Sequence, residues 1–503
     1  MIHDTRLRDA VHPPTWQNPE PKDRYHLVVI GAGTAGLVAA AGAAGLGARV
    51  ALIERGLMGG DCLNVGCVPS KGVIAAARAW SAARRARDEF NFSLVAPDGD
   101  GAGDDDGDFG AVMERMRRLR AHIAPVDGAE RFKSLGVDVF FGDAHFTSDR
   151  TIEVGASTLR FRRAVIATGG RPTAPAIPGL ADVPYLTNET LFDLTARPPH
   201  LIVLGGGPIG CEMAQAFARL GSMVTQIERS ACVLPRDDRE AAAIVGRALE
   251  RDGVTLLCGT TVDRVERTNA GVMVTVTTGA TSRTIEGSHL LVAIGRAPNV
   301  EGLGLERARV AYNSSGVTVN DRLQTSNVRI FACGDICSPL KFTHAADFQA
   351  RTVIQNALFF GRKRASALVI PWATYTSPEV AQVGHTPESA KAAGVAIETF
   401  TVPMRDVDRA ILDGDTDGFA RVHVRAGSDT IVGATVVASH AGDLIAEYTL
   451  CMTNGLGLSA IGSTIHPYPT HGDALRKSAD VWRKTRLTPT VRSLFAKWFR
   501  WFN

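Results

Sequence analysis

The chain has 503 residues, of which 45% are hydrophobic and 21% are charged, which is ordinary for a globular protein of more than one domain. Its formal net charge of +3 gives no argument for a nucleic-acid surface, and eight scattered cysteines are too few for a disulfide scaffold. No apolar run approaches the roughly eighteen residues of a membrane span, and the N-terminus has no apolar signal region, so the cytoplasm is the expected compartment.

The first predicted domain follows a Pro-rich extension of residues 1–24. From Tyr25 the sequence predicts a buried strand (Leu27–Ile30), a glycine turn, an Ala/Gly-rich helix and a second strand that ends at Glu54. Strand, turn and helix in this order are typical of a dinucleotide-binding βαβ unit.

The turn has the G-x-G-x-x-G spacing of that unit. Gly31 allows the tight turn, Gly33 lets the backbone approach a pyrophosphate, and Gly36 lets helix and strand pack closely. The N-terminus of the helix offers unpaired N–H groups to the phosphates, and Glu54 is placed to bind ribose hydroxyls.

Two cysteines follow in the segment "GGDCLNVGCVPSK", residues 59–71, in which Lys71 comes one helical turn after Cys67. Three interpretations are a metal half-site, a pair of inert core cysteines, and a redox pair. A structural zinc site needs four ligands, and no second Cys/His pair lies at a suitable spacing nearby. Inert cysteines explain neither the glycines nor the lysine, but at this point of the chain the three interpretations stay open.

An Asp/Gly-rich stretch at residues 97–110 lacks the ligand spacing of a calcium loop, so it is predicted to be a solvated loop before a helix at 111–122.

The dinucleotide pattern recurs about 174 residues later. The strand Leu201–Leu204 is followed by Gly205, Gly207 and Gly210 at the same spacing, then by a helix and a strand that ends at Glu228. Two such patterns predict two nucleotide sites.

Other apolar strands end in small or acidic residues. "AVIATGGRP" (164–172) delivers Thr168 and Gly169, and "VRIFACGDIC" (328–337) delivers Asp335. Ligands gather at the carboxyl ends of strands in open α/β sheets, so Asp335 is a candidate partner for a polyol chain.

Together these motifs resemble the flavin disulfide reductases, a family that includes glutathione reductase, dihydrolipoamide dehydrogenase and mercuric reductase. The resemblance covers residues 25–487 and implies FAD on the first glycine turn, NAD(P)H on the second, and a homodimer. The implied fold class is α/β, with two Rossmann-like dinucleotide-binding domains and a C-terminal α+β dimerisation domain. The expected divisions are an extension (1–24), an FAD domain in two parts (25–197 and 298–365), an NAD(P)H domain (198–297), an interface domain (366–487) and a tail (488–503).

The resemblance also implies that Cys62 and Cys67 are a redox pair, with a thiolate pKa lowered near a helix N-terminus. Cys67 would lie over the flavin and exchange charge with it, while Cys62 would be the outer thiol that attacks the substrate. Lys71 would stabilise negative charge near the reactive flavin nitrogen, and Glu212 stands where the family keeps the carboxylate that pairs with this lysine.

Cofactor choice depends on Glu228. A carboxylate at that place accepts hydrogen bonds from a ribose 2′-hydroxyl and repels a 2′-phosphate, so NADH is favoured. NADPH stays an alternative, because the neighbouring Arg229 could take the phosphate.

The C-terminal domain departs from part of the family. Glutathione reductase and dihydrolipoamide dehydrogenase have H-P-T-x-x-E there, with a His–Glu pair as base for the outer thiol. This chain reads "HPYPTHGD", so alignment on the threonine puts Tyr468 at the histidine's place, Asp473 at the glutamate's, and His466 two residues early. Tyrosine is a poor base at neutral pH, and a P-Y-x-T pattern is similar to mercuric reductase. All three side chains are therefore candidates for the base and its partner.

The acceptor stays open between classes. A disulfide or dithiol acceptor, as in dihydrolipoamide dehydrogenase, is favoured because an N-terminal metal-binding domain and a C-terminal cysteine pair of mercuric reductase are missing. Reduction of Hg(II) to Hg(0) is the alternative, and a flavin-based redox sensor or membrane-recruited partner protein is a further one. No resident metal site is expected.

The tail "TVRSLFAKWFRWFN" (490–503) places Val491, Leu494, Phe495, Trp498, Phe499 and Phe502 on one helical face, with Arg and Lys residues among them. Packing on the enzyme's own dimer and peripheral contact with the inner face of the cytoplasmic membrane are the two alternatives.

Overall fold

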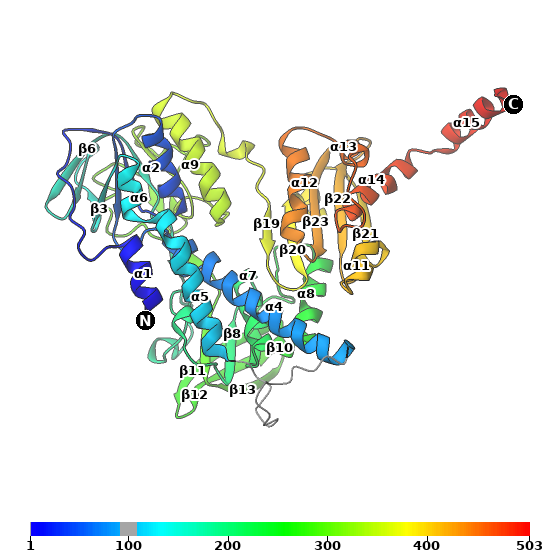
Figure 1. Ribbon diagram of the computed structural model, residues 1–503, viewed down its shortest axis with the longest axis horizontal. Coiled ribbons are helices and arrows are strands. Elements are labelled where there is room, and N and C mark those ends of the chain that lie inside the picture. The colour runs from blue at the N-terminus through cyan, green and yellow to red at the C-terminus, as the bar shows by residue number, and fades with distance from the viewer. Residues whose placement is uncertain (1, 91–107, 503) are drawn as a thin grey trace. The chain divides into compact units, whose positions relative to one another are not determined.

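A computed structural model describes residues 2–90 and 108–502, so most of the Asp/Gly-rich stretch lies outside the described residues. The described chain forms two compact units (Figure 1). The first unit contains residues 1–205, 216–225 and 262–368, and the second contains residues 206–215, 226–261 and 369–503. The predicted α/β class is confirmed.

The largest sheet belongs to the first unit. It has seven strands in the order β3-β2-β1-β6-β5-β4, with β18 paired to β6. β1 is parallel to both β2 and β6, in a register that sets Val29 opposite Leu52 and Val165. Its run Leu27–Ile30 is buried, as expected for a parallel strand that is covered on both faces. The strands are β1 (Tyr25–Ile30), β2 (Val50–Glu54), β3 (Val137–Phe141), β4 (Ala144–Phe146), β5 (Thr151–Val154), β6 (Ser157–Ile166) and β18 (Ile330–Ala332).

Small residues let two helices of this unit pack closely together. A Cβ on Gly42 of α2 would stand 2.6 Å from Cδ1 of Ile354 on α9, so a larger residue there would require the Ile354 side chain to shift. The remaining elements of this region are α1 (Ile2–Val11), α2 (Thr34–Gly45), α3 (Gly60–Asn64), α4 (Cys67–Phe90), α5 (Phe109–Ile123), α6 (Ala129–Ser134), β7 (Gly170–Pro172), β15 (Arg296–Pro298), β16 (Tyr312–Asn313), β17 (Gly316–Val317) and α9 (Thr343–Leu358).

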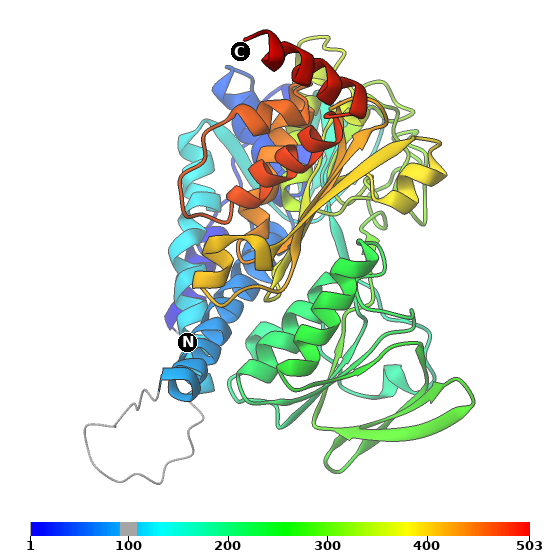
Figure 2. The same ribbon diagram turned by 90° about the vertical axis from the view of Figure 1, so that its right-hand side faces the viewer.

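A second sheet has the order β10-β9-β8-β14, in which β14 is parallel to β8. A smaller sheet has the order β11-β12-β13, and its antiparallel pair β12–β13 belongs to the green part of the chain in Figure 2. These elements are β8 (His200–Leu204), α7 (Pro208–Arg219), β9 (Met223–Ile227), α8 (Arg239–Arg251), β10 (Val254–Leu257), β11 (Thr260–Thr268), β12 (Gly271–Thr278), β13 (Thr281–Gly287) and β14 (His289–Val292).

The C-terminal part of the second unit is an antiparallel sheet with the order β19-β20-β23-β22-β21. Every residue of β23 is buried, because apolar side chains from α12, α13 and α14 join those of the sheet in one core. The elements are β19 (Trp372–Thr374), β20 (Glu379–Gly384), α10 (Pro387–Ala392), β21 (Ile397–Pro403), α11 (Asp408–Leu412), β22 (Phe419–Arg425), β23 (Ile431–Ala438), α12 (Ala441–Thr453), α13 (Leu458–Ser463), α14 (Asp473–Thr485) and α15 (Pro489–Trp501). Among residues 2–90 and 108–502, no helix combines the length and the apolar character that crossing a bilayer requires.

Candidate active site

The two predicted redox thiols come together at a break between helices. Cys62 lies on the short helix α3 and Cys67 is the first residue of α4, so the turn between them folds one thiol toward the other. Cys62 is half-buried, whereas Cys67 is exposed. A side-chain hydrogen bond with Cys67, together with burial, raises the pKa of the Cys62 thiol above its ordinary value. The expected lowering of a thiolate pKa is therefore not found at Cys62, because the neighbouring thiol and the loss of solvent outweigh the helix end.

The hydroxyl of Thr343 lies beside the same pair. Its Oγ1 stands 3.4 Å from Sγ of Cys67, and its hydrogen bond to Cys62 partly offsets the rise in that thiol's pKa. Thr343 is the first residue of α9, so the positive end of that helix points toward the thiols. No pattern in the sequence indicates this contact, because Thr343 is 276 positions from Cys67.

A buried arginine fixes the backbone between the cysteines. Arg120 of α5 donates from Nη1 to the carbonyl oxygen of Asn64 at 2.7 Å and from Nη2 to Oδ1 of Asp4 at 2.9 Å. The side chain of Asn64 also donates to the carbonyl oxygens of Met58 and Gly60. The turn between Cys62 and Cys67, called the redox turn below, is therefore fixed by hydrogen bonds to the backbone and to the side chain of Asn64.

The first glycine turn has the geometry of a nucleotide cradle. Gly31 has φ +97°, and a Cβ on Gly31 would stand 2.4 Å from the Ala167 carbonyl oxygen. Gly33 precedes α2 and has no atom closer than 3.7 Å to the place of a Cβ, so a ligand can approach its backbone. The carboxylate of Glu54 accepts from Ala32 N at 2.7 Å and from Gly56 N at 2.8 Å.

The segment after β6 is locked to the strand that follows β14. Oγ1 of Thr168 donates to the Asn299 carbonyl oxygen at 2.9 Å, and Nδ2 of Asn299 donates back to the Thr168 carbonyl at the same distance. Asn299 N also donates to the Gly169 carbonyl oxygen. Thr168 and Gly169 therefore belong to a rigid turn at the carboxyl end of β6.

Asp335 lies at the carboxyl end of β18 within a charged cluster. Its Oδ2 is 3.6 Å from Nε of Arg296, which also forms an ion pair with Asp61, the residue before Cys62. Burial raises the pKa of Asp335, while Arg296 and Lys341 act against that rise. Through Arg296, this cluster connects Asp335, the predicted partner of a polyol chain, with Asp61 beside the redox turn. Asp61 and Arg296 were missed by the sequence analysis, although Arg296 follows directly after the apolar strand and glycine of "LLVAIGRAPN".

The second glycine turn repeats the carboxylate arrangement of the first. Gly205 has φ +113°, and the place of a Cβ on Gly207 has no atom within 4 Å. Glu228 accepts from Gly206 N at 2.5 Å and from Ser230 N at 2.6 Å. Glu54 likewise accepts from the second residue of its glycine turn, Ala32, and from Gly56, which lies two residues after Glu54 itself. Gly210 lies on α7.

Lys71 and Glu212 belong to different units. Lys71 is half-buried on α4, in the first unit. Glu212 is buried in the second unit, where it accepts from Tyr375 N at 3.0 Å. The pairing of these two side chains stays a prediction.

In the C-terminal domain, His466 has a carboxylate partner on another helix. Its Nε2 lies 3.0 and 3.1 Å from the two carboxylate oxygens of Glu447 on α12, and its Nδ1 lies 3.0 Å from the Thr464 carbonyl oxygen. The Glu447 carboxylate and the Thr464 carbonyl oxygen therefore orient the imidazole ring of His466. Glu447 was missed by the sequence analysis.

The other two C-terminal candidates have different partners. The hydroxyl of the exposed Tyr468 donates to Oδ2 of Asp408 at 2.9 Å, which raises the pKa of the phenol. Asp473 pairs with Arg476 at 2.8 Å and with Lys477 at 3.0 Å. Burial alone would raise the pKa of Asp473, but these two cations lower it below its ordinary value. The role of Asp473 as the carboxylate beside the base stays a prediction, and cations of its own helix α14 pair with its carboxylate.

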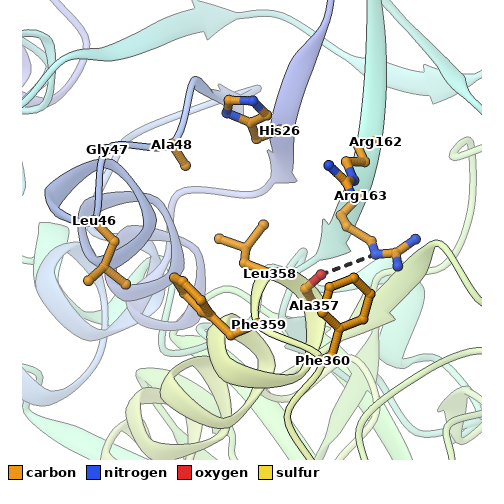
Figure 3. A pocket seen from close by; sticks show the side chains of 10 residues that line it. All are labelled: His26, Leu46, Gly47, Ala48, Arg162, Arg163, Ala357, Leu358, Phe359 and Phe360. Carbon is orange, nitrogen blue, oxygen red and sulfur yellow. Dashed lines mark hydrogen bonds between the residues drawn. The ribbon is translucent and has the colours of Figure 1, made fainter.

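A separate surface pocket contains none of these residues (Figure 3). Nε of Arg163 donates there to the Ala357 carbonyl oxygen at 3.1 Å, near the end of α9. The pocket lies by the start of β1, whereas the carboxyl ends of the strands carry the glycine turns. Arg163 therefore has a structural role, because it binds a backbone carbonyl oxygen near the end of α9. The lining residues are His26, Leu46, Gly47, Ala48, Arg162, Arg163, Ala357, Leu358, Phe359 and Phe360.

Comparison with protein families matches two regions of the chain. Residues 25–350 match the pyridine nucleotide-disulphide oxidoreductase family, and residues 370–479 match the dimerisation domain of the same family.

Individual relatives cover nearly the whole chain. A mercuric reductase of Streptomyces lividans is 36% identical over 461 residues, which is 90% of this chain and 95% of the relative. A dihydrolipoyl dehydrogenase of Thermus scotoductus is 34% identical over 477 residues, which is 92% of this chain and 98% of the relative. Among solved structures, LpdA from Mycobacterium tuberculosis is 29% identical with a TM-score of 0.81 and covers 91% of this chain and 99% of its own. The flavoprotein disulfide reductase RclA of Escherichia coli, solved as a Cu(II) complex, is 27% identical with a TM-score of 0.78 and covers 92% of this chain and 100% of its own.

Proposed function

Because the chain belongs to the pyridine nucleotide-disulphide oxidoreductase family, whose members use FAD and NAD(P)H, we propose that it reduces a disulfide acceptor with electrons from NADH. The dimerisation domain supports a homodimer as the working form. A cytoplasmic location accompanies the proposal, because a reducing compartment suits a catalytic disulfide.

The residues of the first unit fit FAD. The backbone at Gly33 is open to a pyrophosphate, Glu54 is oriented for ribose hydroxyls, and Asp335 offers a half-buried carboxylate at a strand end. When bound, FAD supplies the two-electron relay between the nicotinamide and the thiols. Lys71, paired with Glu212, is proposed to place a positive charge beside it.

For the second nucleotide, the oriented carboxylate of Glu228 supports NADH over NADPH. Its two backbone hydrogen bonds hold it where a ribose 2′-hydroxyl can donate, and a 2′-phosphate would meet a fixed negative charge.

The thiol chemistry is an exchange in which two electrons leave the Cys62–Cys67 dithiol. Cys62 as thiolate attacks one sulfur of the acceptor disulfide and releases the other acceptor sulfur, which takes a proton. Cys67 then attacks the sulfur of Cys62, releases the second acceptor thiol and restores the Cys62–Cys67 disulfide. The placement of Cys62 on α3 and of Cys67 at the start of α4, with the Thr343 hydroxyl beside Cys67, is the observation that carries this proposal.

The pair of His466 and Glu447 favours a disulfide as the acceptor. A leaving thiolate needs a proton, and an imidazole oriented by a carboxylate is a group that can donate and take up one. We propose that it serves the thiol site of the other subunit of the homodimer. Glu447→Gln should then lower disulfide turnover by roughly tenfold to a hundredfold while NADH still reduces the bound flavin at the same rate. An equal loss in both steps would assign Glu447 to folding alone.

Hg(II) is the second candidate acceptor, favoured by the identity to mercuric reductase and by the exposed hydroxyl of Tyr468. A redox sensor without an efficient acceptor is the third candidate.

The test is a screen of NADH oxidation by the FAD-loaded enzyme with lipoamide, glutathione disulfide, Hg(II) and quinones. Turnover with a disulfide should be abolished in Cys62→Ser and in Cys67→Ser and retained in the matched control Cys232→Ser. Turnover with Hg(II) alone would replace the proposed acceptor, and negligible turnover with every acceptor would favour the sensor.

A further inference from the structure

The C-terminal helix α15 has its own start signals. Thr488 precedes the helix and its hydroxyl accepts from Val491 N at 3.3 Å, while Pro489 occupies the first turn. The helix runs to Trp501, and Figure 1 shows it as the last element of the chain. It lies beyond the residues that match the dimerisation domain. The proposed function therefore gives this helix no task.

Large apolar side chains of α15 are exposed. Trp498 is 53% exposed and Trp501 is 78% exposed, and no residue of the helix is buried. At 3.6 residues per turn, the apolar side chains occupy an arc of roughly 160°. They are Val491, Leu494, Phe495, Trp498, Phe499, Trp501 and Phe502.

Positive charges flank this arc. Arg492 lies beside one edge of the arc, Lys497 lies near the other, and Arg500 lies on the opposite face. No Asp or Glu follows Asp480 in the sequence, whereas Arg483, Lys484 and Arg486 precede the helix. The whole C-terminal segment is therefore cationic as well as aromatic.

We propose that α15 binds the surface of an anionic lipid bilayer. Trp and Phe side chains suit the headgroup boundary, and Lys and Arg residues are attracted to anionic lipids. A helix of 13 residues is only about 20 Å long, so it lies in the plane of the interface rather than across the membrane. A second copy of α15 is disfavoured as the partner, because two cationic helices repel each other.

The residues between α14 and α15, 486–488, connect this helix to the dimerisation domain. Nη2 of Arg486 lies 3.3 Å from Oε2 of Glu398 and 3.4 Å from the Ser428 carbonyl oxygen. A homodimer would carry two such helices, so attachment of one would raise the effective concentration of the other at the same surface.

The experiment uses the FAD-loaded full chain and vesicles of phosphatidylcholine with or without phosphatidylglycerol. The intact protein should co-sediment with the anionic vesicles, bind the neutral ones at least tenfold less tightly, and be released as salt rises toward 1 M, where the Debye length falls to about 3 Å. A chain that ends at Leu487 should stay in the supernatant and keep its NADH-dependent turnover.

Point variants separate the charge from the apolar face. The triple variant Arg492→Gln, Lys497→Gln, Arg500→Gln should weaken binding by on the order of a hundredfold. Trp498→Ser and Phe499→Ser should each weaken it by about tenfold or more. The matched control is Ser493→Ala on the polar face, which should bind as the intact protein does.

Several outcomes would overturn the proposal. Equal sedimentation of the intact and truncated chains would show that α15 does not bind lipid. Equal binding to neutral and anionic vesicles would remove the role of the cations. Failure to bind any vesicle, with a smaller oligomer for the truncated chain in light scattering, would instead assign α15 to contact between copies of the enzyme.

Discussion

The helices at the two ends of the described chain differ in how far their apolar side chains are buried. The N-terminal segment (residues 2–20) contains few large apolar side chains, yet Leu7 and Val11 of α1 are buried. The C-terminal helix α15 is rich in Trp and Phe, yet none of its residues is buried. Apolar content alone therefore does not decide which terminal helix packs on the enzyme.

The difference comes from polar contacts that give the N-terminal segment a defined place. The ring of His12 lies 2.6 Å from the Gly56 carbonyl oxygen and stacks on Phe141, and Trp16 donates from Nε1 to the Val139 carbonyl oxygen at 3.2 Å. Asn18 bonds the backbone of Phe141 in both directions. This segment pairs with the β3 edge of the large sheet, whereas the side-chain hydrogen bonds of α15 lie within residues 487–500.

The largest expected effect is a contrast between two deletions. Removing residues 1–20 should lower the free energy of unfolding by roughly 4–6 kcal/mol, because it exposes the site of Leu7 and Val11 and breaks the hydrogen bonds of the segment. Removing residues 488–503 should change it by less than about 1 kcal/mol. Urea unfolding of the FAD-loaded protein measures both, and equal losses would end the comparison.

A second contrast concerns acid, because the domain that carries α15 contains a buried histidine. Burial, helped by the charge of Arg421, lowers the pKa of His423 to about 4. The unfolded chain takes up this proton near pH 6.5, so stability is full above pH 6.5 and falls as the pH drops toward 4, by up to about 3 kcal/mol.

The matched variant for this test is His423→Gln. It should flatten the decline in stability between pH 6.5 and 4.5, measured by urea unfolding at each pH. An unchanged decline would mean that other groups cause the acid sensitivity.

A third and smaller effect tests how the N-terminal segment reaches the redox turn. Arg120→Met keeps the stem of the side chain but removes the charged donor to the Asn64 carbonyl oxygen and to Asp4, so stability should fall by about 2 kcal/mol and turnover by several-fold. Arg118→Met, at an exposed position of the same helix, is the control and should change neither.

The smallest effect compares two tryptophans. Trp16→Ala should cost about 2 kcal/mol, because the ring is partly buried and bonded to the backbone. Trp498→Ala should stay within about 0.5 kcal/mol in the absence of lipid. A large loss for Trp498→Ala would mean that α15 packs on the enzyme after all.

Local patterns in the sequence predicted the parts of the site that depend on local geometry. The strand predicted at Leu27–Ile30 is β1 (Tyr25–Ile30), and the one predicted at Leu201–Leu204 is β8 (His200–Leu204). Gly31 and Gly205 were predicted because a tight turn needs a positive φ, which leaves a direct mark on the residue type.

The residues that were missed act across long sequence separations. Glu447 contacts His466 from another helix, and Thr343 reaches Cys67 from 276 positions away. Nothing in the residues around His466 indicates which carboxylate faces it, so alignment proposed Asp473 instead. Arg120 looked like one more cation of a surface helix, and only tertiary packing shows that it is buried against the redox turn.

The repeated anchoring of Glu54 and Glu228 has a consequence for how the two nucleotides are retained. Two backbone N–H groups hold each carboxylate, so binding of a ribose there would not require the roughly 0.5–1.5 kcal/mol of side-chain ordering. This preorganisation is equal at both turns. It therefore cannot by itself cause one nucleotide to stay bound while the other exchanges. The asymmetry has to arise beyond the carboxylates. At the first turn, Val11 of the N-terminal segment accepts from Met58 N at 3.1 Å and so clasps the loop that follows Glu54. At the second, the loop after Glu228 begins with the exposed Arg229. We expect the residence time of the nucleotide at the first turn to depend on this hydrogen bond between Met58 and Val11.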